Sequence, residues 1–140
     1  MKILDTSIAH RLINSIWDEI STPGKTLLTP DDVKGAEFTI IESNSTMIKI
    51  QTTGGSDISI DRESFHAALH FLLINGRTSP SKACEIGSSN GTPGELDRVT
   101  RKTGPRVINY ILPILAEAGI VGIDGMRNSQ HPKNTTWTII

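Results

Sequence analysis

The residues best able to do chemistry in this sequence are Glu63, His66 and His70, which fall within one stretch expected to be helical. Their spacings of three and four residues place the side chains on one face of a helix, where imidazole and carboxylate groups can hold a metal ion. The sequence has no HExxH motif, and no further ligand stands out. We therefore expect a hydrated edge beside the apolar stripe of this helix, with no bound metal and no other cofactor.

Two other groups of residues carry weak signals for catalysis. Gly24-Lys25-Thr26 is similar to the end of a phosphate-binding loop, but the first glycine of that motif would fall at position 19, which is Glu19. Cys84 is the single cysteine, and in an expected strand it fits a small buried apolar side chain better than a nucleophile. The sequence thus shows no catalytic constellation, and we expect the protein not to be an enzyme.

The composition is that of an ordinary globular chain. Its 140 residues include 36% hydrophobic and 21% charged residues, which suits one core or two small packed subdomains. No apolar run approaches the roughly 20 residues of a membrane span, and the first residues are too polar for a signal peptide. A single cysteine allows no internal disulfide, so we expect a cytoplasmic protein.

The net charge of −1 conceals an uneven distribution. Residues 1–76 contain six basic and ten acidic residues, a net charge of −4, whereas residues 77–140 contain eight basic and five acidic residues, a net charge of +3. A basic second half is a weak indication of an anionic partner at one end of the molecule.

Apolar spacing predicts a helix followed by three strands in the first part of the chain. The helix stripe comprises Ile8, Leu12, Ile13, Ile16, Trp17 and Ile20. Asp5 or Thr6 can cap this helix, and Thr22-Pro23-Gly24 ends it. Residues 37–42, 47–52 and 57–60 predict a three-stranded antiparallel meander, with one face of the sheet packed.

The second part predicts three helices and a hairpin. The first helix runs from Arg62 to about Asn75 and is followed by a loop with a short strand at 82–86. The next helix spans residues 94–102, with Leu96 and Val99 inward. The apolar stripes of the first and third helices comprise Phe65, Leu69, Leu72 and Leu73, and Ile108, Ile111, Leu112 and Leu115. The third helix spans 105–118 and ends at Gly119, and strands at 120–124 and 135–140 enclose a polar tip.

The segment VINYILPILAEAGIV resembles the recognition helix and wing entry of many bacterial winged-helix proteins. The shared features are an inward apolar stripe, an Ala-Gly stop and a β-branched pair that begins a strand. The resemblance covers roughly residues 62–140 and implies an α+β fold. In this fold, an N-terminal helix and a three-stranded antiparallel meander (1–61) pack with a C-terminal winged helix-turn-helix (62–140).

The resemblance implies binding to double-stranded DNA. The outward face of the helix at 105–118 would carry Arg106, Asn109, Tyr110, Pro113 and Glu117, with Arg106 and Asn109 placed to read bases. Pro113 and Glu117 count against a good fit to the groove. Phosphate contacts would come from the preceding helix and the wing tip, which contribute Arg98, Arg101, Lys102, Arg127, Asn128, His131 and Lys133.

Two functions remain open at this point. The first is DNA binding, as a regulator or as the targeting part of a bacterial restriction or defence system. The second is a protein-interaction module that uses the same fold without DNA. A homodimer is compatible with the first function, because paired winged helices match two-fold operators. The N-terminal half could contact a protein partner.

Overall fold

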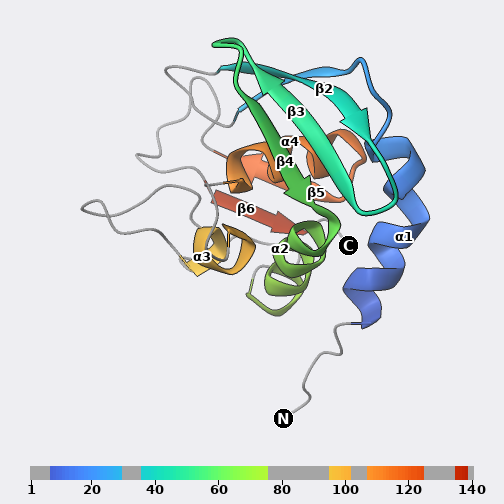
Figure 1. Ribbon diagram of the computed structural model, residues 1–140. Coiled ribbons are helices and arrows are strands. Elements are labelled where there is room, and N and C mark those ends of the chain that lie inside the picture. Colours follow the sequence, from blue (N-terminus) through green and yellow to red (C-terminus); the bar gives the residue numbers. More distant parts are fainter. Residues whose placement is uncertain (1–6, 30–35, 76–94, 102–106, 125–134, 139–140) are drawn as a thin grey trace.

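The computed structural model describes residues 7–29, 36–75, 95–101, 107–124 and 135–138 (Figure 1). Its elements are α1 (Ser7–Ile20), β1 (Thr26–Leu28), β2 (Glu37–Ser43), β3 (Met47–Thr52), β4 (Asp57–Asp61), α2 (Arg62–Asn75), α3 (Glu95–Arg101), α4 (Ile108–Glu117), β5 (Val121–Asp124) and β6 (Thr135–Thr138). The predicted α+β class is confirmed. None of the helices in the described ranges is long and apolar enough to cross a membrane.

The main sheet is an antiparallel meander of four strands in the order β1-β2-β3-β4. The sequence predicted β2, β3 and β4 but not β1, so the expected number of three strands was wrong. The strand β1 has only three residues, too few to show an alternating pattern. It exists because it pairs with β2, with Thr26 opposite Thr39 and Leu28 opposite Glu37.

The alternation predicted for β3 is confirmed. Ile48 and Ile50 are fully buried, whereas Gln51 is exposed on the opposite face. In β2 the register shifts between Ile40 and Glu42, which leaves Ile41 38% exposed. One face of the sheet therefore packs against the helices.

The buried apolar side chains form one core between the sheet and the helices. Both halves of the chain contribute to it, as shown by Ile13, Phe38, Ile48, Phe65, Leu96, Ile111 and Leu115. Figure 1 shows the sheet on one side of the molecule, with α1 beside it and α2, α3 and α4 on the helical side. The expectation that the meander supplies core to the C-terminal half is confirmed.

Helix α3 differs from its prediction in which side chains it buries. Leu96 is fully buried as expected, but Val99 is 40% exposed, so its predicted inward position was wrong. The buried face is set by Leu96 and Thr100, which are four residues apart. Oγ of Ser64 on α2 donates a hydrogen bond to the carbonyl oxygen of Thr100 at 2.8 Å, and this contact fixes the rotation of α3.

The end of α4 follows the sequence prediction. Gly119 has a φ of +78°, a conformation that favours glycine, and the amide of Ile120 donates to the carbonyl oxygen of Leu115 at 3.1 Å. The chain then enters β5, which pairs antiparallel with β6, Val121 lying opposite Thr138. The predicted hairpin strands are confirmed, while its tip at 125–134 and the short strand at 82–86 lie outside the described residues.

Candidate functional site

The residues predicted to contact DNA divide into two sets. Six of them lie outside the described residues: Lys102, Arg106, Arg127, Asn128, His131 and Lys133. Of the other four, Arg98 on α3 is exposed and Arg101 at the end of that helix is half-buried. Asn109 and Tyr110 lie near the start of α4 and are half-buried.

Helix α4 is covered along nearly its whole length. Of its ten residues only Glu117 is exposed. Pro113 is buried, so its predicted place on an outward face was wrong. The reason lies in composition, because a helix that is apolar on almost every side belongs inside a core.

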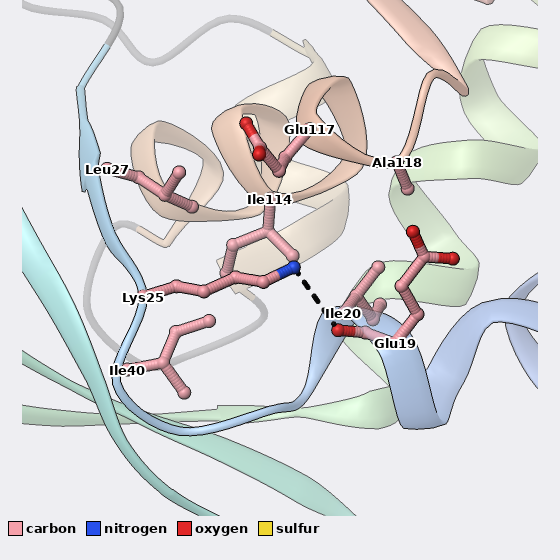
Figure 2. Close-up of a pocket in the computed structure, with 8 residues that line it drawn as sticks. All are labelled: Glu19, Ile20, Lys25, Leu27, Ile40, Ile114, Glu117 and Ala118. Atoms are coloured by element: carbon pink, nitrogen blue, oxygen red, sulfur yellow. Dashed lines mark hydrogen bonds between the residues drawn. The ribbon is translucent and has the colours of Figure 1, made fainter.

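The sheet and α1 cover one side of α4. Figure 2 shows Ile114 of α4 pointing into a narrow hollow whose walls include Ile20, Leu27 and Ile40, from α1, β1 and β2. The ring of Tyr110 meets Phe38 of β2 edge-on, with 5.1 Å between the ring centroids and an angle of 76°. Tyr110 therefore contributes to the contact between α4 and the sheet.

A polar cluster lies where α1 meets α2. It comprises His10 of α1 with Glu63 and His66 of α2, and one donor atom from each lies within 4.8 Å of the others. The rings of His10 and His66 are stacked with their centroids 4.0 Å apart and an angle of 27°. Nδ1 of His66 lies 3.4 Å from Oε1 of Glu63.

His66 is unusual in this cluster because it is buried and its ring nitrogens make no hydrogen bonds among the described residues. Its exposed fraction is 7%, so the predicted hydrated edge was wrong at this residue. Neither Nδ1 nor Nε2 makes a hydrogen bond within the described part of the chain. A buried polar group left in this state costs about 1–3 kcal/mol of stability, so the site favours a partner for this ring.

Burial and a neighbouring histidine favour the neutral form of the His66 ring. Burial lowers the pKa of His66 below its usual value, the nearby His10 lowers it further, and Glu63 partly opposes the shift. A neutral imidazole has a free lone pair on one nitrogen. The cluster therefore offers two imidazole groups and one carboxylate, which are metal-ligating groups.

The sequence predicted part of this cluster. Glu63 and His66 are adjacent as their spacing required, whereas His70 is not part of the group that the structure brings together. His10 was missed, because no pattern in the sequence indicates that this end of α1 packs beside the start of α2. The signal available was a histidine on the polar side of the first predicted helix.

Comparisons with known proteins identify no relative: no family model, no curated protein and no solved structure matches this chain significantly.

Proposed function

We propose that this chain is a DNA-binding protein built on a winged helix-turn-helix, which holds the phosphate backbone through α3 and the basic segments beside it. The observation that carries the proposal is the arrangement of α2, α3, α4 and the β5–β6 pair. These elements follow one another in winged-helix order, α2 contacts both α3 and α4, and β5 and β6 contact α4 and α2 respectively.

Helix α3 corresponds to the first helix of the helix-turn-helix, the helix that crosses the DNA backbone in such proteins. Arg98 is exposed on this helix. Residues 77–140 carry a net charge of +3, against −4 for residues 1–76. The positive half of the chain thus supports an attraction to phosphate, and each phosphate that is neutralised releases bound counterions.

Base reading is the weaker part of the interaction that we propose. In a helix-turn-helix the second helix lies in the major groove, and that helix corresponds to α4. Glu117 is the one exposed side chain of α4, Asn109 is half-buried, and Tyr110 packs against Phe38 of the sheet, so neither Asn109 nor Tyr110 is freely presented to bases. We therefore propose binding that is dominated by the backbone and shows little sequence preference.

Fluorescence anisotropy with labelled duplexes over a range of salt concentrations tests this function. We expect the logarithm of the association constant to fall linearly with the logarithm of salt concentration. Arg98→Glu should weaken binding and reduce the salt slope by about 1, as expected for loss of one phosphate contact. Asn109→Ala should leave affinity and sequence preference unchanged.

Arg11→Glu is the matched control, because Arg11 is an exposed arginine on α1 and its substitution changes the net charge by the same amount. Only Arg98→Glu should weaken binding. No binding at low salt would overturn the DNA proposal, and equal effects of the two substitutions would remove α3 from the contact surface.

A second candidate is a protein-interaction module with the same fold, and the cover over α4 favours it. Two apolar side chains also face solvent near α3: Ile74 at the end of α2 is 53% exposed and Val99 on α3 is 40% exposed. Sedimentation equilibrium tests self-association through this region. The candidate predicts an oligomer that Ile74→Asp dissociates, and a monomer at all concentrations would contradict self-association.

A further inference from the structure

The polar cluster between α1 and α2 has the chemistry of a metal site. We propose that His10, Glu63 and His66 bind one Zn²⁺ ion, which ties α1 to α2. Imidazole nitrogen and carboxylate oxygen are common ligands of Zn²⁺ in proteins, and all three donor atoms already lie within 4.8 Å of one another.

The distances suit an ion of this size. Bonds of about 2.0–2.2 Å in a tetrahedral site place neighbouring ligand atoms about 3.3–3.6 Å apart. Nδ1 of His66 and Oε1 of Glu63 are 3.4 Å apart, so this pair already has the required separation. The side chain of Glu63 is 62% exposed, so it has room to adjust, and the proposal requires the His10 ring to rotate out of its stack to bring the third ligand to the ion.

His66 supplies an independent indication that a ligand belongs here. It is 7% exposed, and neither of its ring nitrogens has a hydrogen-bond partner among the described residues. Because its neighbours hold this ring in place, it acts as a fixed anchor that the two more mobile ligands approach. Nδ1 has only the 3.4 Å contact with Glu63, so a metal bond satisfies one of two ring nitrogens that make no hydrogen bond.

The positive side chain of Arg62 is held by partners outside the proposed site. Arg62 lies beside Glu63 in the chain, and its guanidinium packs over the Trp17 ring at 4.7 Å. It also donates hydrogen bonds to the carbonyl oxygen of Ser45, at 3.0 Å, and to Oδ1 of Asn14. The carboxylate of Glu63 is thus left for the ion, and water completes a fourth position, as in other three-ligand zinc sites.

Titration of the untagged full chain with zinc, in competition with a chromophoric chelator, measures the affinity and the stoichiometry of zinc binding. We expect one Zn²⁺ per chain and a melting temperature that rises with Zn²⁺ concentration, since an ion bound only to the folded state stabilises it. His10→Ala and Glu63→Gln should each weaken zinc affinity about 100-fold or more, because loss of even an outer partner of a metal ligand costs 10- to 100-fold. Both should also abolish the zinc-dependent rise in melting temperature.

His70→Asn is the matched control, a histidine on α2 outside the cluster. It should retain both the affinity and the zinc-dependent rise. A wild-type affinity in His10→Ala and Glu63→Gln would overturn the proposal, as would a loss of binding in His70→Asn, which would make His70 a ligand in place of one of the three. The absence of one-to-one binding in the wild-type chain would also overturn it. The His10 and Glu63 variants keep the test independent of whether a His66 variant folds.

Discussion

Helices α1 and α4 are both rich in apolar residues, but they differ in how much of their surface is buried. Helix α1 buries Ala9, Ile13, Trp17 and Ile20 on one face and keeps a polar face in solvent. Helix α4 exposes one side chain, Glu117. The difference shows that α4, the more apolar of the two helices, is a core element, and that exposed polar groups are carried by the elements around it.

The largest predicted loss of stability comes from replacing a buried isoleucine by alanine, and we compare it between α4 and α1. Ile111→Ala on α4 removes a fully buried side chain and should lower the free energy of unfolding by about 2–5 kcal/mol. Ile16→Ala on α1, where the side chain is half-buried, should cost less than half as much. Urea unfolding of both variants measures the difference. Equal losses would contradict the contrast between the two helices.

A smaller effect is expected from the link between α2 and α3. Ser64→Ala removes the buried hydrogen bond to the carbonyl oxygen of Thr100 and should cost about 1–3 kcal/mol. Ser15→Ala on α1 is the control, because its hydroxyl bonds a carbonyl oxygen of its own helix at an exposed position. Thermal unfolding should distinguish the two. A neutral Ser64→Ala would show that this bond does not orient α3.

The sequence predicted the helices and strands well wherever the apolar residues of a single element recur at helical or strand spacing. The boundaries of α2 and of the strands β3 and β4 were predicted within a residue, because stripes and alternation are local signals. The short strand β1 was missed because it is defined by its pairing with β2. The inward position predicted for Val99 failed because helical spacing alone left the rotation of a seven-residue helix undetermined.

The candidate sites were harder to predict for a related reason. The spacing of Glu63 and His66 is visible in the sequence, but His10 joins them only through the packing of α1 on α2. In the same way, the apolar stripe of α4 was evident, whereas the cover on its other side comes from Leu27 and Ile40, far away in the chain. Contacts between distant segments carry no local pattern.

The turn between β2 and β3 offers a prediction of intermediate size. Oδ1 of Asn44 accepts hydrogen bonds from the amides of Thr46, at 2.8 Å, and Met47, at 3.0 Å. Asn44→Ala should therefore cost about 0.5–1.5 kcal/mol in urea unfolding. An effect as large as that of Ile111→Ala would show that this turn contributes as much to stability as the buried side chain of α4.

The smallest effect is expected on the solvent side of the sheet. Nζ of Lys49 lies 3.4 Å from a carboxylate oxygen of Glu42, whose side chain is 61% exposed. Lys49→Met keeps the apolar stem and should cost about 0–1 kcal/mol at low salt. The loss should disappear in 1 M salt, where such pairs are screened. A loss independent of salt would indicate that packing of the stem, and not charge, is responsible.

Amide hydrogen exchange of the free protein, read separately for α1 and α4, tests the central claim that α4 is the covered core helix. We expect the amides of Ile111, Leu112, Ile114 and Leu115 to exchange only through global unfolding, and those on the outer face of α1 to exchange through smaller openings. Added duplex DNA should slow the α4 amides only as much as the other amides that exchange through global unfolding, because a ligand of the folded state raises its overall stability and the DNA contacts that we propose lie elsewhere. Rapid exchange in α4, or extra protection confined to α4 on adding DNA, would contradict the account and return α4 to the role of a reading helix.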